Sequence, residues 1–201
     1  ASDVYKRQEI SIAKYTQALQ GFLQIEPNSK KLKPYVQYRI GKMFCYGLGT
    51  EQNYQKAFEW FERSAKQKNK FAQFSLANLY YYGSGIEKDL SQAFLWYQRS
   101  SSQGQPYAAY SIAQMYRYGE YVTKDNDTAQ RYYKQALSGF LKIESDDMAN
   151  DDLFYKLGQM FNLGLGTDSD VTKAIEYFRR SAEMNNKNGL FEYGKALLTG
   201  E

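Results

Sequence analysis

The apolar residues of this chain recur with the period of a helix, and the pattern itself repeats. Trios at positions i, i+3 and i+4, such as Ile40, Met43 and Phe44, occur in four segments, and each trio predicts one buried helix face. A small residue recurs in these segments, at Gly41, Ala77, Ala113, Gly158 and Gly194. A larger side chain there would hold a neighbouring helix away, so we expect close helix packing at these positions.

A second, more aromatic helix follows each of these segments. Its stripe, Ala-x-x-aromatic-aromatic followed by mostly small residues at i+7 and i+8, begins at Ala57, Ala93, Ala129 and Ala174. Four residues before each alanine stands a short polar residue that can accept a backbone N–H at a helix start: Asn53, Asp89, Asp125 and Asp170. No segment has the alternation of a strand, so the pattern predicts an all-α chain of paired helices.

A glycine-containing turn separates the two helices of each pair. "YYYGSGIEKD" at 80–89 has relatives in "YGLGTEQN" at 46, "YGEYVTKD" at 118 and "LGLGTDSD" at 163. A phosphate-binding glycine loop needs a strand before it, whereas these turns have a helix on both sides, so we interpret them as repeat boundaries. Tyr121 replaces the second glycine of the third turn, and we expect that turn to be altered.

The aromatic residue eight positions before each turn gives the repeat length. Tyr38, Phe74, Tyr110, Tyr155 and Phe191 are spaced by 36, 36, 45 and 36 residues. A longer period also exists, because "YTQALQGFLQIEPNSKK" at 15 resembles "YKQALSGFLKIESDDMA" at 133. A period of this size indicates stacked helix-turn-helix units.

The 45-residue unit extends its second helix through Phe140, Leu141 and Ile143, as Phe22, Leu23 and Ile25 do earlier in the chain. Because amphipathic stripes usually face a core, we expect these residues to pack on a lengthened next helix near Leu153. The alternative is a protruding ridge that binds a partner.

The segment from Ala77 to Ser101 follows the pattern small-x-x-aromatic-x-x-Gly-x-Gly-x-x-x-Asp-x-x-x-Ala-x-x-Trp-aromatic-x-x-small-small. This pattern resembles the Sel1-like repeat, a relative of the tetratricopeptide repeat, and it recurs in register over roughly residues 11–201. The resemblance implies a right-handed α/α solenoid whose first helices line a concave surface that holds other proteins. Exported bacterial members often carry a disulfide in each repeat, so the single Cys45 argues against that subgroup.

The repeats also predict how the chain is organised. Residues 1–8, "ASDVYKRQ", match nothing downstream and are set aside as an expression or sequence-assembly remnant. Residues 9–201 are expected to form a single solenoid of four full helix pairs with partial units at both ends. Neither end resembles a polar capping unit, so we expect a fragment of a longer array. The chain also resembles, more weakly, the Sel1-type arrays that lie C-terminal to bacterial plasmid-mobilisation proteins.

Composition narrows the possible classes of protein. Among 201 residues, 20 tyrosines, 12 phenylalanines and only 3 prolines indicate a packed chain. The net charge of +4 comes without any run of five like charges, so charge does not identify a nucleic-acid or lipid partner. No apolar stretch reaches the length of a membrane span, and a lone cysteine gives no sign of an oxidising compartment. We therefore expect a cytoplasmic location.

The side chains offer little for catalysis. Histidine is absent, and Cys45 has no second cysteine, so we expect no enzyme, no cofactor and no metal site, with Cys45 as a structural residue. The acidic stretch lacks the spacing of a calcium loop, and we expect solvated, helix-capping acids at Glu144, Asp146, Asp147, Asp151 and Asp152. Its relative in the earlier block is basic, at Lys30, Lys31 and Lys33, so weak head-to-tail self-association is a possible consequence.

Aligning the units to tetratricopeptide geometry leaves a second set of residues on the first helices turned toward a groove. These candidate partner-binding residues are Tyr38, Lys42, Tyr46, Phe74, Asn78, Tyr82, Tyr110, Gln114, Tyr118, Tyr155, Gln159, Phe191 and Lys195. Polar side chains among amphipathic tyrosines suit peptide recognition. The alternative is that these aromatics only pack between repeats.

A protein-interaction scaffold that binds a peptide or partner domain on this concave face is the function that the residues favour. A nucleic-acid-associated module would use basic residues such as Arg39, Lys42, Arg117 and Lys195 on phosphates, but acids are interleaved with them. A hydrolase that binds carbohydrate or cell-wall peptides through aromatics lacks a nucleophile–base pair.

Overall fold

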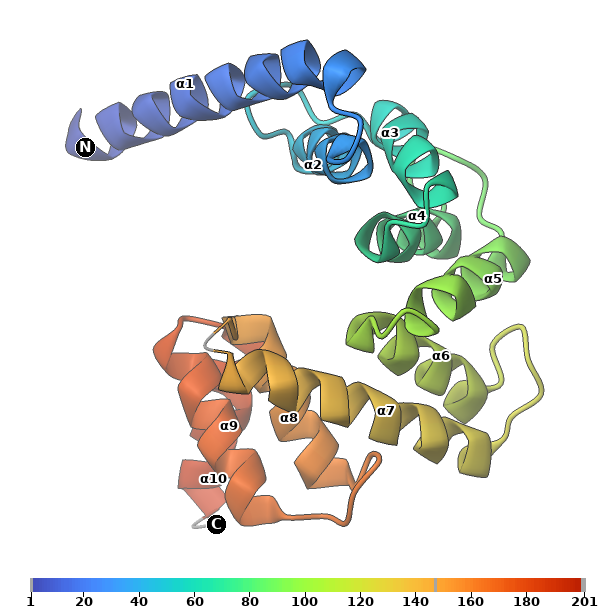
Figure 1. Ribbon diagram of the computed structural model, residues 1–201. Helices are drawn as coiled ribbons and strands as arrows, with labels where there is room; N and C mark the ends of the chain where they lie inside the picture. The colour runs from blue at the N-terminus through green and yellow to red at the C-terminus, as the bar shows by residue number, and fades with distance from the viewer. Residues whose placement is uncertain (1, 147, 200–201) are drawn as a thin grey trace. The chain divides into compact units, whose positions relative to one another are not determined.

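A computed structural model describes residues 2–146 and 148–199. The chain divides into two compact units, Ala1–Gln103 and Gly104–Glu201. The first unit, blue to green in Figure 1, contains α1 (Ser2–Ile25), the short 3₁₀ helix η1 (Glu26–Asn28), α2 (Lys33–Tyr46), α3 (Tyr54–Lys66), α4 (Lys70–Tyr82) and α5 (Leu90–Ser101). The second contains α6 (Pro106–Tyr118), α7 (Asn126–Ser145), α8 (Asp151–Leu163), α9 (Val171–Glu183) and α10 (Lys187–Thr199).

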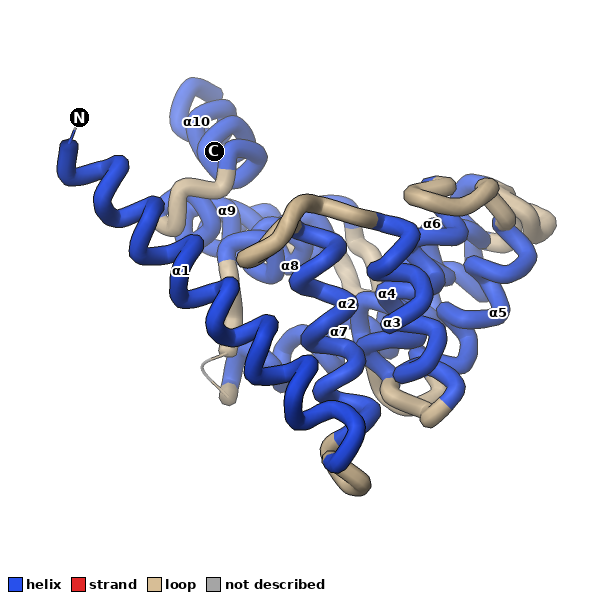
Figure 2. Tube along the Cα trace, turned by 90° about the horizontal axis from the view of Figure 1, so that it is seen from above, coloured by secondary structure: helices blue, strands red, loops and turns tan. Residues whose placement is uncertain are grey.

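The helices form the predicted pairs. α2 packs on α3 and α4 on α5 in the first unit, while α6 packs on α7 and α8 on α9 in the second. The first helix of a pair is called helix A below, and the second helix B; α10 is a further helix A. The described residues contain no strand (Figure 2), so the all-α repeat class is confirmed.

Short polar residues start the B helices, as predicted. The side chain of Asn53 accepts a hydrogen bond from Lys56 N at 2.8 Å, and Asp125 accepts one from Thr128 N at 3.0 Å. Asp89 and Asp170 cap α5 and α9 in the same way. These bonds satisfy backbone donors that have no partner within the helix, which fixes where each helix begins.

Small residues bring the two helices of a pair together. A Cβ on Gly41 would lie 2.6 Å from the Phe61 ring, and one on Gly158 would lie 2.5 Å from the Phe178 ring, which confirms the predicted close packing at both positions. Gly194 has nothing within 4 Å of such an atom, so close packing does not explain that glycine.

A hydroxyl on helix B fixes the pair along its axis. Ser100 Oγ donates to Lys70 O at 2.7 Å, and Ser181 Oγ donates to Asp151 O at 2.7 Å. Ser64 makes the same bond to Pro34 O. In the long unit the matching residue is Ala136, and there Gly139 contacts Pro106 instead, since a Cβ on Gly139 would lie 2.6 Å from Pro106 Cβ.

The third turn keeps its shape, and the expectation that Tyr121 alters it is wrong. Tyr121 adopts a left-handed φ of +66°, close to the +74° of Gly85 and the +75° of Gly166 in the other turns. Asp125 N donates to Tyr116 O at 3.0 Å, as Asp89 N donates to Tyr80 O at 2.9 Å. The backbone of this turn therefore keeps the same conformation, although a left-handed φ is strained for a tyrosine.

The extension of the long unit is confirmed for helix B only. α7 reaches Ser145, and Phe140 is fully buried, as predicted. α8 has 13 residues, the same as α6, so the expectation of a lengthened next helix is wrong. Phe140 finds its partners on the preceding helix A, where the Tyr107 ring lies 4.9 Å away.

The N-terminal segment that the sequence analysis set aside lies in a helix. α1 begins at Ser2 and continues through residues 2–8 without a break, and the origin of those residues stays a prediction. No helix in residues 2–146 or 148–199 combines the length and apolar character that crossing a bilayer requires.

Candidate partner-binding surfaces

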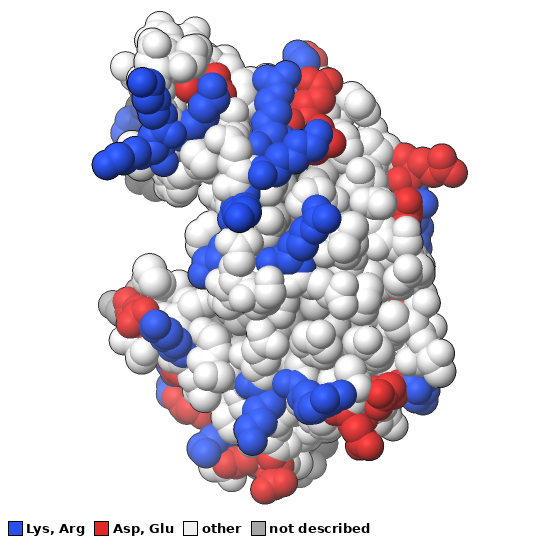
Figure 3. All heavy atoms as spheres, turned by 45° about the vertical axis from the view of Figure 1, so that its right-hand side comes forward, with Lys and Arg blue, Asp and Glu red and all other residues white. Residues whose placement is uncertain are grey.

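Charged side chains of both signs are interspersed on the face of the molecule shown in Figure 3. Ion pairs also occur among the described residues: Arg179 bonds Glu176 and Glu183, and Lys66 Nζ lies 2.8 Å from Glu62. Acidic residues lie among the basic ones on this face, so it lacks the single-sign basic patch that is typical of a nucleic-acid-binding surface.

On α2, the three predicted residues lie in a row at one-turn spacing. Tyr38 is half-buried between Phe61 and Phe71, with ring centroids 6.0 and 5.8 Å away. Lys42 Nζ lies 6.0 Å from the Tyr38 ring and 5.5 Å from the exposed Tyr46 ring. Tyr38 thus packs between helices, whereas Lys42 and Tyr46 offer a cation and an open aromatic face.

On α4, Phe74 and Asn78 contact the helix B of their pair. The Phe74 ring lies 5.9 Å from Tyr97, and Tyr97 Oη donates to Asn78 Oδ1 at 2.7 Å. That bond orients the Asn78 amide and leaves its two N–H donors out of the contact. Tyr82, one turn on, is exposed and meets Tyr81 edge to face at 4.9 Å.

On α6, the structure differs from the prediction at Tyr110. Its side chain is only 8% exposed because it packs on Tyr133 at 5.4 Å and on Phe140 at 6.1 Å. The sequence pattern placed it toward a groove, but the longer α7 supplies rings that cover it. Tyr118 is exposed beside Arg117. Gln114, midway between Tyr110 and Tyr118 in the sequence, is half-buried.

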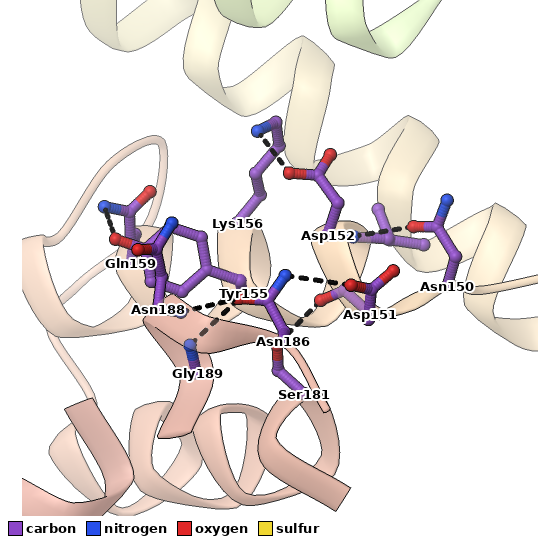
Figure 4. Close-up of polar contacts among 11 residues, drawn as sticks. Asn150, Asp151, Asp152, Tyr155, Lys156, Gln159, Ser181, Asn186, Asn188 and Gly189 are labelled. Atoms are coloured by element: carbon purple, nitrogen blue, oxygen red, sulfur yellow. Dashed lines mark hydrogen bonds and ion pairs between the residues drawn. The ribbon is translucent and has the colours of Figure 1, made fainter. Parts of the chain in front are cut away.

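Figure 4 shows the start of α8, where polar side chains bond one another. Gln159 Nε2 donates to Tyr155 Oη at 2.9 Å, and Tyr155 packs on Phe178 at 6.0 Å. Lys156 Nζ lies 3.0 Å from Asp152 Oδ1, and Asn186 Nδ2 donates to Asp151 Oδ2 at 3.0 Å. Asp151 and Asp152 are therefore partners of neighbouring side chains.

The rest of the acidic stretch behaves in two ways. Glu144 is an ion-pair partner of Arg180 and accepts a hydrogen bond from Tyr177 Oη at 2.8 Å, so it does not match the expected solvated acid. Asp146 is exposed, as expected, and Asp147 lies outside the described residues. No group of metal-binding side chains occurs in the part of the chain that the structure describes.

On α10, both predicted residues are open to solvent. Phe191 is 70% exposed and Lys195 is exposed as well. The five helix A positions occupied by Lys42, Asn78, Gln114, Gln159 and Lys195 are thus polar in every case, and the first four are half-buried.

Burial disfavours the charged form of several tyrosines and of the cysteine. It raises the pKa of Tyr38 to about 12 and the pKa of Tyr107 to about 12. Burial also raises the pKa of Tyr110, and that of the Cys45 thiol. Neutral phenols donate hydrogen bonds and stack but do not act as bases, and a raised thiol pKa makes a poor nucleophile.

Sequence reasoning missed one feature of the first unit, a pocket of about 430 Å³ between α1, α2 and α4. It includes the predicted Tyr38 and Lys42, but also Tyr15, Tyr35 and Arg39. The recurrence of aromatic residues at 35, 71 and 107, one period apart, was a signal that could have indicated it.

A family model described as Sel1 repeat matches residues 34–69, 70–105, 106–139 and 155–186. These matches cover most of α2 to α9 and agree with the repeat boundaries above. No curated protein sequence matches the chain.

Solved structures agree with the family match. A Sel1 repeat protein from Oxalobacter formigenes is 26% identical, with a TM-score of 0.66, over 94% of this chain and 72% of its own. Protein c5321 of uropathogenic Escherichia coli, described as a protective antigen displaying an SLR fold, is 22% identical, with a TM-score of 0.57, over 90% of this chain and 44% of its own. The second likeness concerns the fold alone. The resemblance to arrays of plasmid-mobilisation proteins stays a prediction.

Proposed function

Because the chain belongs to the Sel1 repeat family, we propose that it is a protein-interaction module without enzymatic activity, which binds a peptide or a partner domain through its A helices. The observation that carries this proposal is the polar position that recurs on every helix A beside aromatic side chains. In a protein–protein contact, half-buried polar groups form oriented hydrogen bonds, and the aromatic rings around them supply buried surface area.

The exposed tyrosines support the same function. Tyr46 and Tyr82 lie one turn beyond Lys42 and Asn78, and both rings are largely in water. A tyrosine loses little conformational entropy when it is covered, and its hydroxyl can still bond at the edge of a contact. In the second unit, Tyr118 lies one turn beyond Gln114 in the same way.

The test replaces the polar centres by acids. Asn78→Glu with Gln114→Glu should weaken capture of a partner by the immobilised chain about tenfold or more, because each adds a charge that the contact would desolvate. The helical circular dichroism spectrum should not change. Gln98→Glu with Gln135→Glu is the matched control, since both residues are exposed on B helices. Unchanged capture by the first variant would contradict this face.

We propose a cytoplasmic location as well, on the basis of the single half-buried Cys45. Cell fractionation with an antibody against the chain tests it, and recovery in an extracytoplasmic fraction would refute it.

A further inference from the structure

A second pocket of the first unit is lined by the end of α3, by α5 and by Gln73 of α4, and it is called the B-helix pocket below. Its volume of about 470 Å³ lies in the range of ligand-binding pockets. Three cations line it, Lys66, Lys68 and Arg99, and no acidic residue does. None of the candidate partner-binding residues of the A helices belongs to it. The pocket is therefore a basic site apart from that surface.

Arg99 is the cation that an aromatic ring holds in place. Its guanidinium carbon lies 4.4 Å from the centre of the Trp96 ring, and Trp96 is 8% exposed. Lys66 already has a partner, since its Nζ lies 2.8 Å from Glu62. Arg99 and Lys68 form no ion pair with any carboxylate of the described residues. A guanidinium stacked on a ring still presents the N–H donors at its edge to a carboxylate.

A buried glutamine forms the other polar part of the pocket. Gln73 is 3% exposed, its Oε1 accepts from Gln103 Nε2 at 2.6 Å, and its Nε2 donates to Ala65 O at 3.2 Å. Gln103 Nε2 also lies 3.3 Å from the backbone O of Arg99, to which it donates, so the glutamines and the arginine are linked. A side-chain amide has two N–H donors, so Gln73 can serve an acceptor in the pocket with its second one.

The preceding repeat has a carboxylate bonded to the matching glutamine. Gln37 stands 36 residues before Gln73 and is likewise 3% exposed. Gln67, which is 36 residues before Gln103, donates from Nε2 to Gln37 Oε1 at 2.6 Å, the same bond as in the pocket. Here Gln37 Nε2 donates to Glu26 Oε1 at 2.6 Å, and the Glu26 side chain is 14% exposed. In that repeat the glutamine therefore binds a largely buried carboxylate.

The second unit has a carboxylate bonded to the matching arginine. Arg180 has the position of Arg99 in its helix, six residues after the alanine that begins the stripe. It stacks on the Phe154 ring at 4.0 Å and forms an ion pair with Glu144. The Glu144 carboxylate also accepts a hydrogen bond from Tyr177 Oη at 2.8 Å, and its side chain is 19% exposed. This arginine position is thus a carboxylate site as well.

Helix length explains why the B-helix pocket has no acid of its own. Glu26 and Glu144 are 118 residues apart, at the same place in the longer period of the sequence. Each lies at the end of a long helix, since Glu26 directly follows α1 and Glu144 is in the last turn of α7. α3 ends at Lys66, and the chain enters α4 at Lys70, so this unit lacks the extension that carries the acid. The pocket thus has both kinds of carboxylate partner and no carboxylate.

We propose that the B-helix pocket binds a glutamate side chain from a peptide segment of a partner protein. The carboxylate accepts hydrogen bonds from Arg99 and Gln73, and Lys68 adds a second positive charge beside it. The inference goes beyond the proposed function, because it assigns a second contact surface to the chain and the kind of side chain that this surface recognises.

The indole N–H of Trp96 reports on the pocket directly by NMR. The chain has two tryptophans, so an isotopically labelled sample gives two indole signals, and Trp60, outside the pocket, is the internal control. The probe is a peptide that copies residues 140–145 with both ends blocked, so that Glu144 is its one carboxylate. Titration should shift the Trp96 signal in a saturable way and leave the Trp60 signal in place.

A matched peptide tests the carboxylate. The same peptide with Glu144→Gln should bind about tenfold more weakly, because it lacks the charge-assisted hydrogen bond. Equal binding of the two peptides, or a Trp96 signal that moves with neither, would overturn the proposal.

A matched pair of protein variants tests Arg99. Arg99→Gln should weaken binding of the acidic peptide about tenfold and remove its advantage over the neutral peptide. Arg63→Gln is the control, because Arg63 stacks on Trp60 at 4.9 Å in α3 but does not line the pocket. Both arginines are exposed, so the helical circular dichroism spectrum should stay the same. An advantage that survives Arg99→Gln, or that Arg63→Gln removes as well, would overturn the assignment.

Phosphate is the competing ligand for a pair of cations. If inorganic phosphate or a short oligothymidylate shifts the Trp96 signal at a lower concentration than the acidic peptide, at constant ionic strength, the pocket takes phosphate and the proposal is refuted. A weaker effect of both supports the carboxylate. Neither Asn78 nor Gln114 lines the pocket, so a failed titration leaves the proposed function standing, and a failed capture test leaves the pocket.

Discussion

Gly166 lies so close to the backbone of α7 that a Cβ on it would stand 2.5 Å from the carbonyl carbon of Tyr133. Gln130 fastens the same loop, since Gly166 N donates to Gln130 Oε1 at 2.6 Å and Gln130 Nε2 donates to Gly164 O at 3.0 Å. The second glycine of a turn therefore serves the contact with the preceding helix B as well as the turn.

Gly166→Ala should destabilise the chain by more than backbone strain alone. The left-handed φ disfavours alanine by about 1 kcal/mol, and the clash with Tyr133 adds roughly 1–3 kcal/mol. Gly104→Ala is the matched control, because Gly104 has φ +74° but nothing within 4 Å of a Cβ. Urea unfolding followed by circular dichroism measures both, and equal losses would show that the contact with Tyr133 is unimportant.

Tyr121→Gly should stabilise the chain, because it relieves the left-handed strain that the tyrosine bears. The expected gain over Tyr121→Ala is about 1 kcal/mol, since alanine keeps the strain while removing the ring. The comparison of the two variants in thermal unfolding isolates the backbone effect. A lower midpoint for the glycine variant than for the alanine variant would contradict the argument.

The partly buried ion pair between Arg180 of α9 and Glu144 of α7 should stabilise the fold more than the exposed pairs of α9. Arg180 stacks on Phe154 at 4.0 Å and pairs with the mostly buried Glu144, so Arg180→Met should cost about 2 kcal/mol. Arg179 is more exposed and pairs with Glu176 and Glu183, so Arg179→Met should cost only about 0.5 kcal/mol. Chemical denaturation of both variants gives the comparison, and a reversed order would refute it.

Three helix caps should make stability depend on pH in the acid range. A backbone hydrogen bond from Gln92 lowers the pKa of Asp89, a side-chain bond from Thr128 lowers that of Asp125, and a backbone bond from Lys173 lowers that of Asp170. A carboxyl with a lowered folded pKa stabilises the fold above its ordinary pKa of about 4, and this stabilisation is lost as the pH falls through the folded value.

The triple variant Asp89→Asn, Asp125→Asn, Asp170→Asn should therefore flatten the acid limb of the stability profile. Asparagine still caps a helix, as Asn53 does here, so the unfolding midpoint at neutral pH should change little. Thermal midpoints between about pH 6 and pH 3 test this. The same steep acid loss in the variant would assign it to other carboxylates.

Head-to-tail self-association stays a prediction, and the structure limits the charges available for it. Glu144 and Asp152 already have basic partners, and Lys33 Nζ lies 3.8 Å from Glu26. Among the described residues, the exposed Lys30, Lys31 and Asp146 are candidates to carry the attraction. Any association should then weaken as salt rises. Light scattering that gives one molar mass at all salt concentrations would refute it.

The fold was predictable because the same sequence signals recur in every repeat of the chain. The predicted features depend on contacts within one helix pair, and the spacing of residues along the chain determines those contacts. They are the caps at Asn53 and Asp170, the stripe that begins at Ala57 and the small residue Gly41. Such contacts join residues of the same helix pair, so the pattern of one repeat is enough to place them.

The candidate surface was harder to predict, because exposure depends on what the neighbouring helices bring. Tyr110 has the same position in its helix as Tyr38, yet α7 supplies Phe140 to cover it. The pocket at Arg39 depends on α1, which lies one helix pair earlier, and on the absence of an acid at position 35. Neither circumstance follows from the pattern of a single repeat.

The turn at Tyr121 shows that the two glycines between helix A and helix B have different roles. Gly119 closes α6, and the bond from Asp125 N to Tyr116 O carries the chain to α7, so the path is complete without a second glycine. At the other turns the second glycine has no side chain, so another helix can pack closely against it, as at Gly85 and Gly166. Tyr121 puts a side chain at this position. A tandem array can thus change the packing beside one turn while the number and register of its repeats stay the same. The second glycine position of a turn is therefore a place where a repeat protein can diversify without a change of fold.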